Sequence, residues 1–161
     1  MKLNIANKIM KDTSFRRRLK KIEELEKDRI FCGHGLDHLL TVARLTVLIC
    51  QERGISADPD IVYSAALLHD IGRVEEYTLG LPHETAGAEA AEEILSGIGC
   101  GEEEAAEIIR LILSHRKRSA ERGTLEAAFY EADKKSRACS FCKAKDQCNW
   151  PDNKKNMDIE V

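Results

Sequence analysis

The segment "SAALLHDIGR", residues 64–73, raises the central question of this sequence. Its small and branched apolar residues predict a buried helix, but the run ends at His69 and Asp70, which soluble cores usually exclude. Adjacent helical residues point about 100° apart, so both side chains can face one point only where the helix ends. Gly72 is consistent with such an end. Either an ordinary helix leaves the core here, or the core holds a ligand for this pair.

The composition is that of a globular domain. The chain has 161 residues, of which 43% are hydrophobic and 33% charged, and this length can bury a core without disulfides. With 25 Lys and Arg against 28 Asp and Glu, the net charge of −3 gives no basic field for nucleic acid. No apolar run is long enough for a membrane span, and "MKLNIANKIMKD" lacks the apolar core of a signal peptide. We therefore expect a cytoplasmic protein without membrane or nucleic-acid partners, and its oligomeric state is open.

The sequence predicts an all-α fold of five or more helices. Aromatic residues make up only 5% of the chain, and β-branched residues mostly fall within helical patterns. Asp58 before Pro59 predicts one helix start, Thr124 predicts another, and Gly54 predicts a helix end. For the helix of 13–29 we expect Thr13 or Ser14 as the cap. The other helical patterns cover 36–53, 59–70, 83–99, 102–115 and 125–138, and 73–82 is expected to be a loop.

Histidines and aspartates recur at helix ends or beside apolar stripes. Taken singly, each has an ordinary explanation: a histidine satisfied within the core, or an acid that caps a helix. Taken as an ordered set, they favour a metal site, because a buried carboxylate needs a partner and imidazole with carboxylate suits iron, manganese or zinc. The residues of this set are His38, His69, Asp70, His83, His115 and Asp133.

This set resembles the HD superfamily of metal-dependent phosphohydrolases. "GHGLDHLLTVARL" is similar to that family's H-x-x-x-V pattern, with Val42 following His38, and "AALLHDIGR" is close to its most recognisable string. "HETAGAEAAEEIL" and the later "LILSH" are similar to a further histidine pair in two-metal members. The resemblance covers roughly residues 30–135 and implies a compact helical bundle around a central metal site.

The resemblance also implies ligands. A first ion would be held by His38, His69, Asp70 and Asp133. His83 and His115 would add a second ion, with Asp70 bridging; otherwise His83 is a loop residue that touches substrate, and His115 is a basic group at a helix end. The cofactor would be one or two ions of manganese, iron, zinc, cobalt or nickel.

The general acid or base is left unassigned. The family often has an acid three residues after the aspartate of its His–Asp pair, and Arg73 stands there in this chain. His34, Asp37 and Glu84 are candidates for that role. Arg73, Lys117 and Arg118 are candidates for binding phosphate, because guanidinium matches phosphate oxygens, although a solvated surface charge is the better explanation of each residue taken singly.

The C-terminal tail contains "CSFCKAKDQC", with cysteines at 139, 142 and 148. In a reducing compartment this density favours metal over disulfides, either zinc or an iron–sulfur cluster, and the alternative is a set of free thiols. We predict Cys32 as the fourth ligand. It precedes His38 by six residues, just as Cys139 follows Asp133 by six, and each offset carries an antiparallel helix about 9 Å toward the same end.

We thus expect N-terminal helices over 1–29 that pack on the core, an HD metal-binding domain over 30–137, and a cysteine-containing tail over 138–161. The leading functional hypothesis is an HD-type phosphohydrolase acting on a nucleotide or another small phosphate ester through metal-activated water. The alternatives are a diiron oxygenase of the same fold and a non-catalytic protein that senses metal or redox state.

Overall fold

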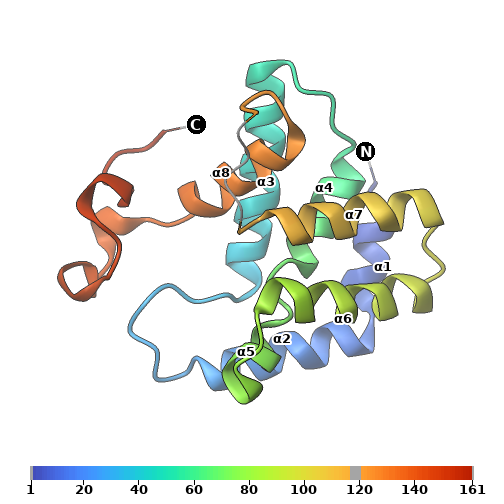
Figure 1. Ribbon diagram of the computed structural model, residues 1–161, viewed down its shortest axis with the longest axis horizontal. Helices are drawn as coiled ribbons and strands as arrows, with labels where there is room; N and C mark the ends of the chain where they lie inside the picture. Colours follow the sequence, from blue (N-terminus) through green and yellow to red (C-terminus); the bar gives the residue numbers. More distant parts are fainter. Residues whose placement is uncertain (1, 117–120, 161) are drawn as a thin grey trace.

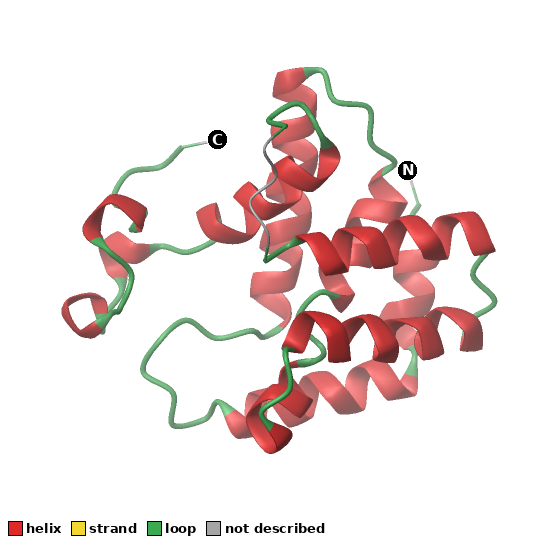
Figure 2. Ribbon diagram, in the orientation of Figure 1, coloured by secondary structure: helices red, strands yellow, loops and turns green. Residues whose placement is uncertain are grey.

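The computed structural model describes residues 2–116 and 121–160, and this part of the chain consists of helices and loops without strands (Figures 1 and 2). The predicted all-α fold is thus confirmed. The helices are α1 (Ile5–Lys11), α2 (Thr13–Leu25), α3 (Leu36–Arg53), α4 (Pro59–Leu68), α5 (Arg73–Leu79), α6 (His83–Gly97), α7 (Glu102–Ser114) and α8 (Leu125–Lys135), followed by the single-turn 3-10 helices η1 (Cys139–Phe141), η2 (Lys145–Gln147) and η3 (Asp152–Lys154).

Helix α4 occupies the centre of the bundle and packs against α1, α3 and α7. Val62, Ala65, Ala66 and Leu68 on this helix have no exposed surface. The two alanines are small enough for neighbouring helices to approach closely, which increases the apolar surface removed from water. Helix α8 packs along α3, and α6 lies beside α7 (Figure 1). The end of α4 therefore points into the middle of the protein.

The N-terminal helices are attached to this core by a side-chain cap. The carboxylate of Asp60 accepts hydrogen bonds from three successive backbone N–H groups at the start of α1, over distances of 2.7–2.9 Å. A carboxylate at this place satisfies free donors and complements the positive end of the helix dipole. Ile9 and Phe15 then join the central apolar cluster.

Three predicted helix caps are confirmed, whereas the cap and the end predicted for α2 are both wrong. Asp58 accepts from Asp60 N at 2.8 Å, Thr124 caps α8, and Gly54 ends α3 with a left-handed φ of 66°. Helix α2, however, is capped by Asp12, whose side chain accepts from Phe15 N at 2.8 Å, rather than by Thr13 or Ser14. It ends at Leu25 instead of residue 29.

The prediction of a loop over 73–82 is wrong, because α5 occupies its first seven residues. No residue of α5 is fully buried, so the sequence carries no apolar stripe that would reveal the helix. Polar contacts hold it instead: Arg18 pairs with Glu75 at 2.8 Å, and Arg73 pairs with Glu76 at 2.7 Å within the helix. Such contacts depend on a neighbouring helix and are not visible as hydropathic periodicity.

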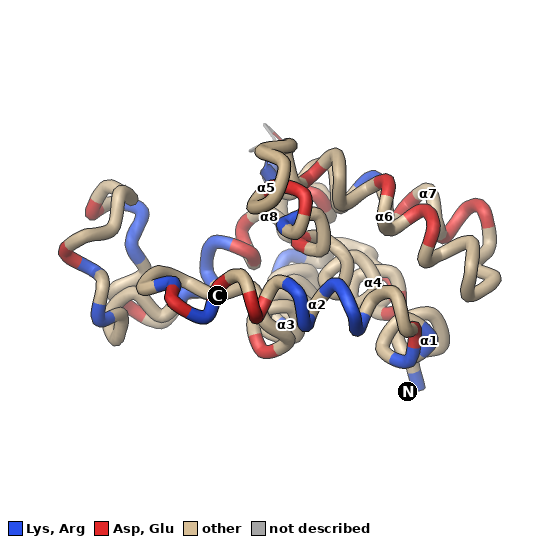
Figure 3. Tube along the Cα trace, turned by 90° about the horizontal axis from the view of Figure 1, so that it is seen from below, with Lys and Arg blue, Asp and Glu red and all other residues tan. Residues whose placement is uncertain are grey.

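The outer surfaces of the helices carry the charge. Lys and Arg residues lie along α2, while Asp and Glu residues lie along α6 and α7 (Figure 3). Both signs occur on solvated helix faces, as is usual for amphipathic helices. Within residues 2–116 and 121–160, no helix combines the length and the apolar character needed to cross a membrane.

Candidate metal centre

Four buried polar residues converge where α4 ends. His38 comes from α3, His69 and Asp70 follow α4, and Asp133 comes from α8. One nitrogen or oxygen from each lies within 4.8 Å of the corresponding atoms of the others, and all four residues are buried. The structure thus brings together the four residues predicted to hold the first ion.

The ring of His69 is oriented by the backbone of its own helix. His69 Nδ1 lies 2.8 Å from the carbonyl oxygen of Ala66, which can only accept, so Nδ1 carries the proton. His69 Nε2 is then the ring nitrogen that faces the other three residues; it is fully buried and has no hydrogen-bond partner. It lies 3.0 Å from Asp70 Oδ2 and 3.8 Å from Asp133 Oδ1. A buried nitrogen between two carboxylates needs a cation there, either a proton on Nε2 or a metal ion bound in its place, so this donor set fits a metal ion.

Ser136 orients His38 in the same way, by contacting its Nδ1 atom. The Ser136 hydroxyl donates to the Asp133 carbonyl at 2.6 Å, so its oxygen is free to accept from His38 Nδ1 at 3.1 Å. His38 Nε2 lies 3.3 Å from Asp70 Oδ2 and 3.4 Å from Asp133 Oδ1, and Arg137 donates to it at 3.1 Å. Fixing Nδ1 as the donor is the usual way in which proteins prepare a histidine for a metal.

A second group of buried ligands shares Asp70 with the first. It consists of Asp70, His83 and His115. His83 Nδ1 contacts the Glu76 carboxylate at 3.0 Å, and His115 Nδ1 contacts the Ile112 carbonyl, so both Nε2 atoms carry lone pairs. These two Nε2 atoms lie 3.1 Å apart, and His83 Nε2 lies 3.5 Å from Asp70 Oδ1. Two lone pairs at this separation call for a proton or a metal between them.

Burial and close contact shift the pKa values of several residues in these two groups. Burial opposes the charged form of His69, but the carboxylates of Asp70 and Asp133 outweigh it and raise the pKa of His69 to about 10. Burial and the positive charge of His69 together lower the pKa of His115 to about 3. Burial also opposes ionisation of both aspartates, yet their histidine contacts hold each pKa well below its usual range. The carboxylates therefore stay ionised and attract positive charge to the first group.

Gly72 explains how His83 reaches the pair that follows α4. A Cβ atom at Gly72 would lie 2.1 Å from the His83 carbonyl oxygen and 2.3 Å from Gly87 N. Backbone atoms cannot give way at such distances, so only glycine permits α6 to cross directly over this turn. Without that crossing, His83 could not stand beside Asp70.

His34 lies at the edge of the first group, on the loop before α3. Its Nδ1 pairs with Glu26, which also accepts from Tyr77 at 2.6 Å, and its ring centroid lies 5.7 Å from that of His38. Burial favours the neutral form and lowers the pKa of His34. Since Nδ1 donates to Glu26, Nε2 remains available as an acceptor.

The structure also places three of the other residues predicted to act in catalysis or to bind phosphate. Arg73 contacts Asp70 Oδ1 at 3.0 Å, on the side of the second group. Glu84 approaches His83 Nδ1 only to 3.9 Å, and Asp37 is exposed on α3. Lys117 and Arg118 lie outside the described residues.

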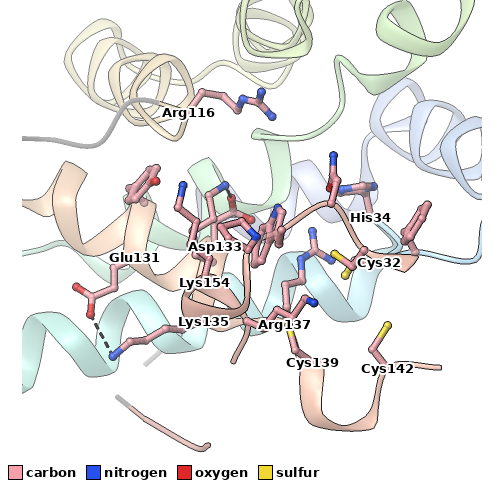
Figure 4. Close-up of a pocket in the computed structure, with 18 of the residues that line it drawn as sticks. Cys32, His34, Arg116, Glu131, Asp133, Lys135, Arg137, Cys139, Cys142 and Lys154 are labelled. Atoms are coloured by element: carbon pink, nitrogen blue, oxygen red, sulfur yellow. Dashed lines mark hydrogen bonds and ion pairs between the residues drawn. The ribbon is translucent and has the colours of Figure 1, made fainter. Parts of the chain in front are cut away.

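A cavity of about 1470 Å³ opens beside this centre (Figure 4). His34 and Asp133 border it on one side, and the predicted cysteine ligands Cys32, Cys139, Cys142 and Cys148 also line it. Within the described residues, no three of these sulfur atoms come within 4.8 Å of one another. The cysteine metal site therefore stays a prediction.

Sequence reasoning missed the residues that orient the ligands. Glu76 and Ser136 each fix a histidine ring, and Glu26 fixes His34. Glu76 sits in the helix that was predicted as a loop, and Ser136 contacts a residue 98 positions away. The sequence around Ser136 gives no signal for its contact with His38, because this contact depends on how α8 packs on α3.

Comparison with known proteins agrees with this geometry. The family model described as HD domain matches residues 35–144. An uncharacterized protein of Clostridium beijerinckii is 43% identical over 153 residues, which cover 95% of this chain and 96% of that protein. The crystal structure of a predicted HD superfamily hydrolase from an uncultured Thermotogales bacterium superposes with a TM-score of 0.59 at 27% identity, covering 88% of this chain and 81% of that one.

More distant similarity connects the chain to larger proteins. Ribonuclease Y of Acetivibrio thermocellus is 30% identical over 127 residues, and that of Clostridium kluyveri is 31% identical over 121 residues. These matches cover 70% and 66% of this chain, but only 24% and 23% of the two ribonucleases. Because the family model spans more than half of the sequence, this chain belongs to the HD domain family.

Proposed function

We propose that this chain is a metal-dependent phosphohydrolase acting on a nucleotide or another small phosphate ester. The supporting observation is His69 Nε2, which is buried without a hydrogen-bond partner and faces two carboxylates that call for a cation. In His38, His83 and His115, too, a neighbouring group holds Nδ1, which leaves Nε2 toward the candidate metal positions. One or two divalent ions, of manganese, iron, zinc, cobalt or nickel, complete such a donor set.

The bound metal would supply hydroxide at neutral pH and neutralise charge on the phosphoryl oxygens. His34 is the residue best placed to accept a proton, because Glu26 holds its Nδ1 and it borders the cavity. Burial lowers its pKa, so the ring is neutral at pH 7 and Nε2 can accept a proton. Arg116 and Arg137 line the cavity and are suited to bind the oxygens of a phosphate.

A small substrate is favoured over RNA. The cavity of about 1470 Å³ accommodates a nucleotide, and its lining is rich in cations although the chain as a whole is acidic. The name of the Thermotogales relative supports hydrolysis, whereas the names of two larger relatives refer to ribonucleases. Short RNA therefore belongs in the assay as a competing substrate.

The test is hydrolysis by the metal-loaded chain of nucleoside mono-, di- and triphosphates, a nitrophenyl phosphate and a short RNA. We expect turnover of the small esters with at least one of the five metals, and a loss on the order of 10³-fold in His69→Ala. Glu103→Gln, an exposed change on α7, serves as the control. Cleavage of RNA alone would overturn the substrate class, and equal activity in His69→Ala would overturn the site.

The alternative of a diiron oxygenase draws on a specific feature, namely that Asp70 belongs to both ligand groups. A shared carboxylate can bridge two ions, and two irons permit dioxygen chemistry. Oxygen consumption by the Fe²⁺-loaded chain, without phosphate release from any ester, would favour the oxygenase. Absence of both activities under full metal loading would favour a non-catalytic sensor.

A further inference from the structure

The C-terminal segment, residues 138–160, has almost no apolar core of its own. It contains three single-turn 3-10 helices, and it lies beside the main bundle rather than within it (Figure 1). Cys139 and Ala144 are its buried residues, whereas Phe141 is 90% exposed. Its direct attachment includes hydrogen bonds from Asn156 to carbonyl oxygens of Lys134 and Arg137. So small a unit normally needs a covalent or metal cross-link to hold one conformation.

Four cysteines stand where such a cross-link would form. Cys139, Cys142 and Cys148 lie in the segment and Cys32 in the loop before α3, and all four line the same cavity. Figure 4 shows Cys32, Cys139 and Cys142 there. Each is a free thiol. Burial raises the pKa of Cys32, and the neighbouring Cys142 and Cys139 raise it further. The three cysteines of the segment thus share one cavity with Cys32, although they lie 107 or more positions from it in the sequence.

Two arginines hold the loop that carries Cys32, and one of them, Arg137, connects this loop to the start of the segment. Arg29 donates to the Cys32 carbonyl at 3.0 Å, and Arg137 donates to the Gly33 carbonyl at 2.6 Å. Arg137 also opposes the rise in the pKa of Cys32 through its positive charge. Lys145 and Lys155 line the same cavity. This concentration of cations offsets the negative charge that several thiolates would carry together with a metal.

We propose that Cys32, Cys139, Cys142 and Cys148 bind a thiophilic metal as four thiolates, and that this centre fastens residues 138–160 to the wall of the candidate active-site cavity. The ligand chemistry is shared by zinc and an iron–sulfur cluster. One zinc ion would draw the sulfurs to about 3.8 Å apart, since each Zn–S bond is about 2.3 Å. Among the described residues, no three of these sulfurs lie within 4.8 Å of one another, so the site either contracts around one zinc or holds a larger cluster.

The experiment uses the full chain, purified without oxygen, in a His69→Ala background that removes metal from the His/Asp centre. Zinc, iron and acid-labile sulfide are measured per chain, together with the visible spectrum. We expect either one zinc, or iron with sulfide and a visible absorption that bleaches on reduction. The first result identifies a zinc site and the second an iron–sulfur cluster, and both support the proposal.

Cysteine variants decide whether this metal is held as proposed. Cys142→Ser and Cys148→Ser should each lose it, while Cys100→Ser, a change outside the cavity, should keep it. Limited proteolysis of the metal-depleted variants should cut within 138–160 at least 10-fold faster, with an unchanged helical circular-dichroism signal reporting an intact bundle. Metal retained in both variants, no metal in any protein, or a disulfide from Cys32 in its place would overturn the proposal. None of these readouts depends on phosphohydrolase activity.

Discussion

The His/Asp centre and the cysteine cluster border one cavity, yet their surroundings differ. The ligands of the His/Asp centre come from long helices, and backbone carbonyls or packed side chains fix their histidine rings. The cysteines come from a loop and from single-turn helices with little buried surface. The first site is therefore prepared by folding of the core, whereas the second contributes to folding only when its metal is bound.

The largest expected effect tests whether the two sites are independent. Asp70→Asn removes the carboxylate shared by both His/Asp groups. We expect loss of metal from these groups and a fall in kcat/KM on the order of 10³-fold, since a bound metal contributes several kcal/mol. Glu52→Gln, a change at an exposed acid on α3, is the control, and elemental analysis with the hydrolysis assay is the measurement. Joint loss of the cysteine-bound metal would show that the sites are coupled.

Gly72 tests whether the His/Asp centre depends on close backbone packing. Gly72→Ala places a Cβ atom 2.1 Å from the His83 carbonyl, so α6 must shift away from the turn. We expect a loss of about 2–4 kcal/mol in the free energy of unfolding, measured by urea denaturation. Gly97→Ala, where a Cβ would meet nothing within 4 Å, should be neutral or slightly stabilising. Equal stability of the two variants would contradict the packing argument.

The sequence predicts features that depend on neighbouring residues, such as helix caps. It does not predict features that depend on contacts between helices. The caps at Asp58 and Thr124 follow from short-range hydrogen bonding, and they are where the pattern placed them. Helix α5 was missed because its contacts are polar and come from α2. Orientation of the rings by Glu76 and Ser136 could not be predicted, since each contact requires the tertiary fold.

Ser136 stands between the two regions, just after α8. Its hydroxyl links His38 Nδ1 to the Asp133 carbonyl, so Ser136→Ala frees the ring to rotate. We expect metal affinity at the first group to fall roughly 10-fold, with little loss of helical structure. Competition with a chelating dye measures this change, and Ser96→Ala on the exposed face of α6 is the control. An unchanged affinity would mean that packing alone orients His38.

The smallest expected effect concerns Glu26. This residue tests how the helical bundle holds the loop that carries Cys32 and His34. Its carboxylate accepts from His34 N at 2.8 Å and from Tyr77 at 2.6 Å. Burial alone would raise the pKa of Glu26, but these donors and the His34 ring lower it to about 2. Because the folded-state pKa lies below the ordinary value of 4.5, the ionised group stabilises the protein above that pH, and the contribution is lost as the pH falls toward 2.

Glu26→Gln should therefore lower the free energy of unfolding by about 1–2 kcal/mol at pH 7, allowing for solvent screening, and the difference should shrink progressively below pH 4.5. Urea denaturation at a series of pH values measures it, with Glu23→Gln on the exposed face of α2 as the control. A difference that stays constant with pH would indicate lost packing rather than lost charge. Since His34 and Cys32 share this loop, a metal-bound cysteine site should also reduce the cost of the change, because the loop would still be held from the opposite side.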